Sequence, residues 1–194
     1  LGREQSGNLM SVGYDMYLKL LEEAVLEERG ETPVRTEEVT ADLVISANIP
    51  SYYVPAAEQR MDLYRRIAAL RDNEGAAELT DELLDRYGDV PKAVTELLDV
   101  ALLRSAAAKV GVCDITQRGT QLIFSFGPQP DIAAIAAAYR QRLQLSATAQ
   151  PKLTLYLQPK EEALSAAGKL VEELALRHEE PAQTKAGNFK EEQP

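Results

Sequence analysis

The sequence predicts an α+β domain in which five or six helices pack on a small, mostly antiparallel sheet of about four strands. Apolar residues recur with the 3.6-residue helical period in several long stretches of the chain. Two short stretches alternate apolar and polar residues on either side of a two-residue turn, which is typical of a β-hairpin. Helical and strand-like stretches are partly segregated along the chain, and this segregation favours α+β over α/β architecture.

Size and charge limit the classes of function that the chain can have. The chain has 194 residues, of which 45% are hydrophobic and 27% charged, so it can bury a core of ordinary globular composition. Its formal net charge is −10. Because proteins that bind nucleic acid neutralise phosphates with Lys and Arg, we expect no direct contact with nucleic acid and favour a basic protein partner. No apolar run approaches the roughly 18 residues that a membrane helix needs, so no membrane segment is expected.

The N-terminal part predicts one helix, a linker and the first strand. An apolar stripe with helical period runs through residues 14–25 and consists of Tyr14, Tyr17, Leu18, Leu21, Ala24 and Val25. We expect residues 1–30 to form a helical connection that ends near Gly30, and residues 31–41 to form a polar linker. Residues 42–50 alternate in the manner of a strand, with Leu43, Ile45, Ala47 and Ile49 on one face.

Three helices are predicted next, over residues 56–71, over residues 75–87, and from Pro91 to about Val110. Glycines mark the ends of the last two, because Gly88 and Gly111 can adopt the left-handed conformation that often follows a helix. Proline is favoured in the first turn of a helix, as Pro91 would be. The second helix should bury Leu79, Leu83, Leu84 and Tyr87.

The C-terminal part predicts a hairpin, a helix, a strand and a last helix. Residues 112–117 and 120–126 flank a turn at Arg118-Gly119, and one face of the second strand carries Leu122, Phe124 and Phe126. A helix over residues 129–143, a strand over 152–157 and a helix from Pro159 to about His178 follow. The domain would thus span residues 42–178, and residues 179–194 bury so little that we expect a mobile tail.

The search for chemistry finds no enzyme signature, no catalytic residue, no cofactor motif and no metal site. Phosphate-binding loops need a GxxxxGK motif followed by Ser or Thr, and the nearest string in this sequence, residues 163–170, fails at both ends. The single histidine, His178, and the single cysteine, Cys113, are too far apart to suggest zinc binding. Cys113 lies in a predicted strand and is expected to be a buried, inert thiol. A lone cysteine also fits a cytoplasmic location.

Four carboxylates are expected on one surface of the second predicted helix. Glu78, Asp81, Glu82 and Asp85, here called the acidic ridge, are spaced three and four residues apart. Arg86 follows Glu82 by four residues and can pair with it. The ridge has two interpretations, which the charge pattern leaves open. It is either an ordinary solvated face or a docking surface for an arginine-rich partner, since Arg–carboxylate hydrogen bonds are strong and directional.

Several strings resemble the C-terminal region of the bacterial transcription-repair coupling factor family. The chain opens with LGREQSG and continues into a helix that contains LLEEAV. Residues 43–55 read LVISANIPSYYVP, residues 60–67 follow the pattern Arg-x-x-Leu-Tyr-Arg-Arg-Ile, and residues 82–91 read ELLDRYGDVP. The resemblance covers residues 1 to about 126, and after residue 127 only the helix–strand–helix order matches. The loop before Glu58 has fewer acidic residues than the family pattern.

This resemblance implies a regulatory, autoinhibitory interaction domain of an ATP-dependent DNA translocase that couples transcription to nucleotide-excision repair. In the family, the C-terminal domain contacts the UvrB-like N-terminal module and masks its UvrA-binding surface until RNA polymerase is engaged. The resemblance then implies partner contacts through Glu82 and Asp85, with Arg86 orienting them and with Glu78 and Asp81 as second choices. UvrA, RNA polymerase and DNA would be reached through the parent protein. The alternatives are an acidic stand-alone docking module without an autoinhibitory role and a hydrolase that uses two inward-facing carboxylates.

Overall fold

The computed structural model describes residues 39–127, 142–146 and 150–179, and it confirms the predicted α+β class. Within these residues there are four helices and five strands. The helices are α2 (Ala57–Ala68), α3 (Asn73–Tyr87), α4 (Lys92–Lys109) and α6 (Ala163–Glu179). The strands are β1 (Thr40–Asp42), β2 (Val112–Arg118), β3 (Gln121–Phe126), β4 (Leu143–Ser146) and β5 (Lys152–Tyr156). No helix in the described ranges is both long and apolar enough to cross a membrane.

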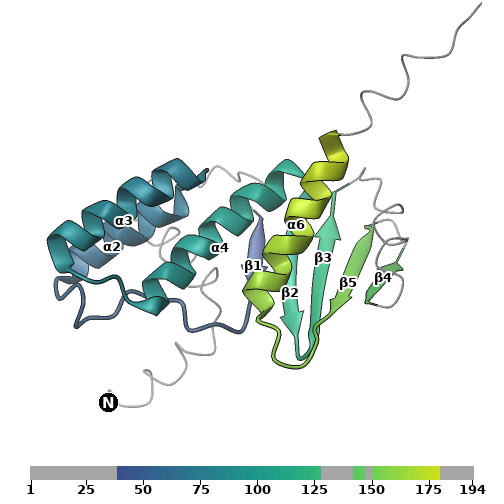
Figure 1. Cartoon of the computed structure of the whole chain (residues 1–194), viewed down its shortest axis with the longest axis horizontal. Coiled ribbons are helices and arrows are strands. Elements are labelled where there is room, and N and C mark those ends of the chain that lie inside the picture. Colours follow the sequence, from purple (N-terminus) through teal and green to yellow (C-terminus); the bar gives the residue numbers. More distant parts are fainter. Residues whose placement is uncertain (1–38, 128–141, 147–149, 180–194) are drawn as a thin grey trace, which may run out of the picture.

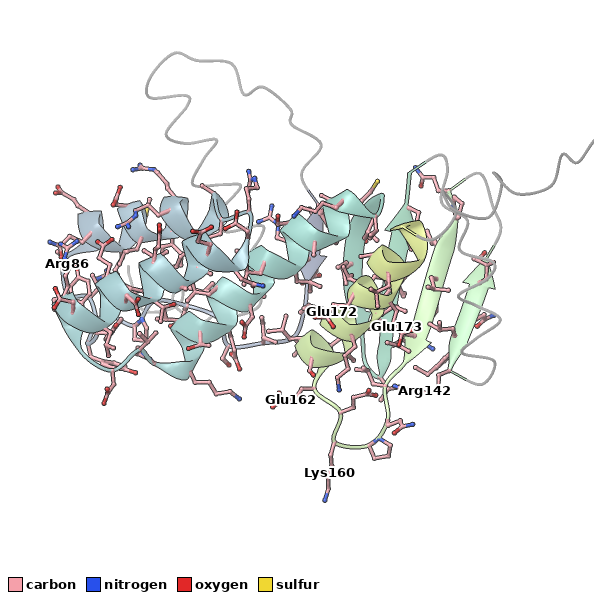
Figure 2. All side chains as sticks on the ribbon, turned by 45° about the horizontal axis from the view of Figure 1, so that its top comes forward. Arg86, Arg142, Lys160, Glu162, Glu172 and Glu173 are labelled. Atoms are coloured by element: carbon pink, nitrogen blue, oxygen red, sulfur yellow. The ribbon has the colours of Figure 1, made fainter. Side chains whose placement is uncertain are left out.

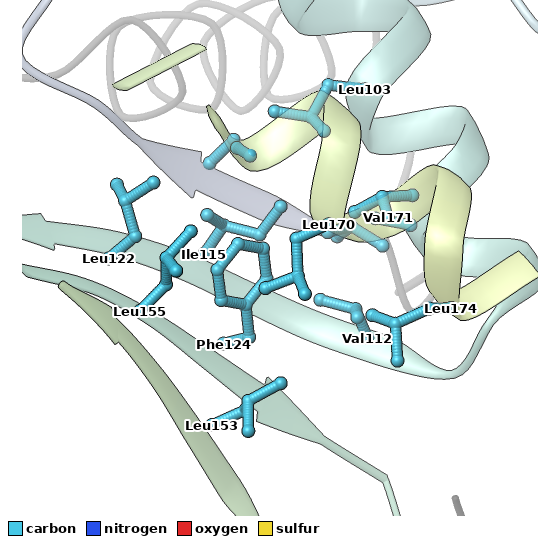
Figure 3. Packing of buried hydrophobic residues seen from close by; sticks show 14 of the residues in the cluster. Leu103, Val112, Ile115, Leu122, Phe124, Leu153, Leu155, Leu170, Val171 and Leu174 are labelled. Atoms are coloured by element: carbon cyan, nitrogen blue, oxygen red, sulfur yellow. The ribbon is translucent and has the colours of Figure 1, made fainter. Parts of the chain in front are cut away.

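The five strands form one mixed sheet in the order β1-β2-β3-β5-β4. β1 pairs with β2 in parallel, and the other three pairings are antiparallel. Helices α4 and α6 lie side by side over the same face of this sheet (Figure 1). Three residues that are directly opposite one another in the register, Ile115, Phe124 and Leu153, have no exposed surface. Figure 3 shows Leu170, Val171 and Leu174 of α6 packed above them.

The buried residues form two clusters that meet at α4. The helical lobe is built from α2, α3, residues 47–54 and the first part of α4, whereas the sheet lobe is built from the sheet, α6 and the second part of α4. Leu97 and Leu98 belong to the first cluster, and Val100 and Leu103 belong to the second. Successive residues of a helix point in directions about 100° apart, so α4 can serve both cores from different faces.

The predicted strand over residues 42–50 is wrong, because the ladder ends at Asp42. Buried and exposed residues do alternate from Ala41 to Ile49, as the sequence pattern predicted. However, the partner strand β2 ends at Arg118, and Thr116 is already opposite Asp42. The next contact is made by a side chain, since Val44 N–H donates to Gln117 Oε1 at 2.9 Å. The chain then leaves the sheet as a connecting segment (residues 43–50) that leads to the helical lobe.

The three central helices are confirmed to within a few residues, but the hairpin turn is displaced by one position. Arg118 pairs with Gln121, so the turn residues are Gly119 and Thr120 and not Arg118 and Gly119. Gly119 has φ 59, a conformation that suits the first turn position of a hairpin and that glycine adopts without strain.

Two predictions for the C-terminal part are also corrected. Leu143, which was predicted to end a helix, is the first residue of β4, a strand that the sequence did not indicate. The rest of the predicted helix over residues 129–143 lies outside the described residues, apart from Arg142. The last helix begins at Ala163 and not at Pro159, because Glu161 accepts hydrogen bonds from Gln158 N–H and Arg142 and so stabilises a turn before the helix.

Two expectations of burial are wrong. Cys113 is exposed, because a register shift between Val112 and Asp114 interrupts the alternation of β2 at this residue. Leu84 is 49% exposed, whereas its neighbour Leu83 is 1% exposed and fills the helical core. The sequence stripe therefore placed one apolar residue too many on the buried face of α3.

Candidate functional site

Helix α3 carries the acidic ridge and is held in place at both ends. Asp72 caps its N-terminus, since its side chain accepts a hydrogen bond from Gly75 N–H at 2.9 Å. Gly88 ends the helix with φ 80 and donates its N–H to Leu84 O at 3.0 Å. Leu79 and Leu83 anchor the inner face in the helical core, so the ridge residues are turned outward.

The structure brings the five predicted site residues together on this outward surface. Glu78, Asp81, Asp85 and Arg86 are exposed, and Glu82 is partly buried. Arg86 lies at the far end of the helical lobe, near the C-terminus of α3 (Figure 2). Its guanidinium carbon is 5.3 Å from the centre of the Tyr87 ring. The ridge is thus continuous in space, as its spacing predicted, but its members have different environments.

Glu82 is held by two arginines from two helices. Arg66 of α2 donates from both terminal nitrogens, with Nη1 2.9 Å from Oε1 and Nη2 bonded to Oε2. Arg86 Nη1 donates to Oε1 at 2.9 Å. These hydrogen bonds lower the pKa of the Glu82 carboxyl from 4.5 to about 2, and Arg66 makes the largest contribution. Glu82 in turn raises the pKa of Arg66.

Arg66 is the site residue that the sequence reasoning missed. It occurs in the resemblance string of residues 60–67, but nothing in its helical period indicates that its side chain reaches α3. The pairing depends on how α2 packs against α3, with Tyr64 and Ile67 of α2 buried in the shared core. Arg66 and Arg86, here called the arginine fork, donate to both oxygens of Glu82. The unpaired carboxylates within the described part of the ridge are therefore Glu78, Asp81 and Asp85.

Tyr53 holds the end of α3 near the ridge. The Tyr53 hydroxyl bonds to the carbonyl oxygens of Leu83 and Gly88, each at 3.2 Å, and its ring lies 5.6 Å from that of Tyr87. Burial, followed by the proximity of Tyr87 and Asp89, raises the pKa of Tyr53. The hydroxyl therefore stays protonated and acts as a structural donor.

The hollow beside the ridge is small. It lies between Arg66, Leu70, Gly75, Glu78, Leu79 and Glu82 and measures about 180 Å³. Pockets for small molecules usually exceed about 300 Å³. Within the described ranges, no group of three or more His, Cys, Asp or Glu residues is arranged to hold a metal ion.

Comparison with known proteins shows what this region is similar to. Residues 43–136 match the family model of the TRCF domain. A transcription-repair-coupling factor from Staphylococcus haemolyticus is 34% identical over 124 residues, which are 63% of this chain and 11% of that protein. One from Staphylococcus epidermidis is 31% identical over 131 residues, or 66% of this chain and 11% of that protein. The chain thus spans about a tenth of the length of these relatives.

A solved structure shares the fold. The crystal structure of a C-terminal domain of transcription-repair coupling factor superimposes with a TM-score of 0.62, at 22% sequence identity, and the match covers 73% of this chain and 94% of that domain. The ridge lies inside the matched range of the family model. The family model and the relatives thus show that residues 43–136 are similar to the TRCF domain of transcription-repair-coupling factors, and the solved structure shows that the fold is shared.

Proposed function

We propose that this chain is a regulatory, autoinhibitory interaction domain of an ATP-dependent DNA translocase that couples transcription to nucleotide-excision repair. In this proposal the acidic ridge contacts a UvrB-like module of the same protein and masks its UvrA-binding surface until RNA polymerase is engaged. The parent protein would work in the cytoplasm and would supply the contacts to UvrA, RNA polymerase and DNA. Residues 1–30 would connect the domain to the motor, and the residues after α6 would be a tail.

The observation that carries the proposal is the acidic ridge on the exposed surface of a TRCF domain. Three carboxylates, Glu78, Asp81 and Asp85, are exposed on one helix with no cation bonded to them in the described part of the chain. Exposed charges give specificity and fast association without the permanence of a large apolar interface. A contact of that kind is reversible, as an autoinhibitory contact must be.

The arginine fork changes which residues are best suited to contact the partner. Both oxygens of Glu82 already accept hydrogen bonds from Arg66 and Arg86, so in this proposal Glu82 orders the ridge. Asp85 and Asp81 are free to accept hydrogen bonds from a partner's guanidinium groups. Arg86 is half-exposed and can also meet a partner carboxylate.

The test measures binding of this chain, in trans, to a purified UvrB-like module from a full-length family member. Asp81→Ala with Asp85→Ala should weaken binding at least about tenfold, and raising the salt from about 0.1 M to 1 M should weaken the wild-type contact further. Glu173→Ala, on α6 and away from the ridge, is the matched control. The same double variant in the full-length protein should raise its ATPase rate and its affinity for UvrA. Unchanged binding, ATPase rate and UvrA affinity would remove the ridge from the mechanism.

The alternative is an acidic docking module without an autoinhibitory role. It shares the exposed ridge but predicts that the chain has no affinity for the UvrB-like module. In that case the double variant would leave ATPase activity and UvrA affinity of the full-length protein at the wild-type level, while binding to a basic partner would still depend on Asp81 and Asp85.

A further inference from the structure

A second surface, lined by none of the acidic ridge residues, is an open groove that runs along α4. It is bounded by α4, the start of α6, the connecting segment 43–50 and the turn between α2 and α3, and its volume is about 1970 Å³. The lining residues of α4 extend from Lys92 to Lys109, the full length of this helix of 18 residues. At about 1.5 Å per residue, the groove offers a track of about 27 Å, which is the length of a five-turn helix.

The groove has an apolar floor contributed by segments that are far apart in the sequence. Leu102 and Ala106 of α4, Leu164 of α6, and Ile45 and Ala47 of the connecting segment line it and are only partly buried. Val44, on the connecting segment, is 78% exposed. Partly covered apolar side chains on several elements that converge on one groove are typical of a docking site for an amphipathic helix.

The walls of the groove are acidic. Among the described lining residues, acidic side chains outnumber basic ones by seven to three. Lys92 lies between Glu96 at 3.3 Å and Glu162 at 3.8 Å, so it is shared by two carboxylates.

Asp99 and Glu172 have no cation bonded to them within the described ranges. Burial, followed by the proximity of Glu96, raises the pKa of Asp99. Figure 2 shows Glu162 at the start of α6 and Glu172 further along this helix.

One glycine in the groove lacks an internal reason for being there. Gly168 lies in the interior of α6, where glycine is less favourable than alanine. A Cβ atom at this position would meet nothing within 4 Å, so the packing of the described structure does not demand a glycine. Because Gly168 lines the groove, its missing side chain leaves room for another backbone to approach α6 closely.

We propose that this groove binds a basic amphipathic helix of a protein partner, whose apolar stripe packs on Leu102, Ala106 and Leu164 and whose Lys and Arg side chains pair with Asp99 and Glu172. The partner helix crosses α6 at Gly168. This contact is separate from that of the acidic ridge and does not depend on it, since no ridge residue lines the groove.

The test uses the full 194-residue chain and three synthetic helical peptides of about 18 residues. The first has leucines at helical spacing and Lys or Arg elsewhere. The second keeps the leucines but replaces every basic residue with Glu, and the third keeps the basic residues but replaces every leucine with Ser. We expect the first peptide to bind at least about tenfold more tightly than either control, as measured by calorimetry.

Variants of the chain then locate the contact. Gly168→Gln fills the groove with a neutral, helix-favouring side chain, and Asp99→Lys reverses one wall charge. Each substitution should weaken binding of the first peptide at least about tenfold. Glu173→Lys, on α6 but outside the groove, should change the affinity for this peptide by less than about twofold. Gly168→Gln should not lower the melting temperature, so its effect on binding cannot be attributed to unfolding.

If the third peptide, which has serines in place of leucines, bound as tightly as the first, the proposal would be overturned. Binding would then depend on charge attraction alone. Unweakened binding by Gly168→Gln would overturn the proposal as well. If Asp81→Lys with Asp85→Lys abolished peptide binding while Asp99→Lys did not, the peptide would occupy the acidic ridge and the groove would carry no such site. These outcomes are independent of the trans-binding test of the ridge, which uses the UvrB-like module.

Discussion

The helical lobe and the sheet lobe both have apolar cores, but they differ in how far apart in the sequence their contacting residues lie. The core of the helical lobe lies between Ile49 and Ala101, so its contacts are local in sequence, whereas the sheet lobe joins residues as distant as Val39 and Leu174. In the helical lobe, tyrosine hydroxyls form hydrogen bonds between elements. The Tyr53 hydroxyl bonds to carbonyl oxygens at the end of α3, and the Tyr64 hydroxyl accepts a hydrogen bond from Ile49 N–H at 2.8 Å. The sheet lobe is held by aliphatic and phenylalanine side chains beneath α4 and α6.

This difference bears on where interaction surfaces can lie. The acidic ridge is on α3 in the helical lobe, where polar bonds between elements fix the orientation of an exposed helix. The groove lies where the two lobes meet along α4. Since α4 supplies buried residues to both cores, damage in one lobe can reach the other through this helix.

The largest expected effect is in the sheet lobe. Phe124→Ala removes a side chain with no exposed surface from the centre of the sheet and should lower the free energy of unfolding by about 3–5 kcal/mol. Chemical denaturation followed by circular dichroism measures this loss. Ile123→Ala, next to it on the opposite face of β3 and partly exposed, is the control and should cost clearly less. Equal losses for the two variants would contradict the assignment of the core to one face.

A smaller effect is expected in the helical lobe. Tyr53→Phe keeps the buried ring but removes the hydroxyl that bonds to Leu83 O and Gly88 O, and it should cost about 1 kcal/mol of unfolding free energy. Tyr52→Phe is the matched control, because Tyr52 is 79% exposed and should tolerate the change. Hydrogen exchange at the C-terminal end of α3 should increase in Tyr53→Phe alone, whereas an increase spread evenly over both lobes would argue against a local fastening role.

The smallest effect is electrostatic. The pKa of Glu82 is lowered from 4.5 to about 2 in the folded protein, so its pairing stabilises the fold above pH 4.5 and this contribution is lost as the pH falls towards 2. Arg66→Ala should raise the pKa of Glu82 towards its ordinary value and flatten this part of the pH–stability curve. NMR titration of the Glu82 carboxyl carbon checks the shift, with Arg71→Ala on the neighbouring turn as a control. A pKa for Glu82 that is unchanged in Arg66→Ala would show that Arg86 alone accounts for the lowering.

Local patterns predicted the helical lobe better than the sheet lobe, and particular residues show why. Gly88 and Gly111 ended α3 and α4 as expected, because the backbone conformation after a helix is set by neighbouring residues. The connecting segment kept its predicted alternation but not its predicted strand, since a strand also needs a partner and β2 stops at Arg118. Cys113 was predicted to be buried, but the register shift in β2 depends on how β3 pairs with it.

The amino-acid sequence by itself determined the α+β class, the three central helices, the hairpin and the placing of four carboxylates on one helix face, because each depends on interactions between near neighbours. Only the tertiary structure decided that Arg66 reaches across to Glu82, that Leu84 is exposed, and that α4 borders a groove with α6 and the connecting segment. These features depend on the packing of elements that are distant along the chain, and no period or spacing within one element specifies how two elements meet.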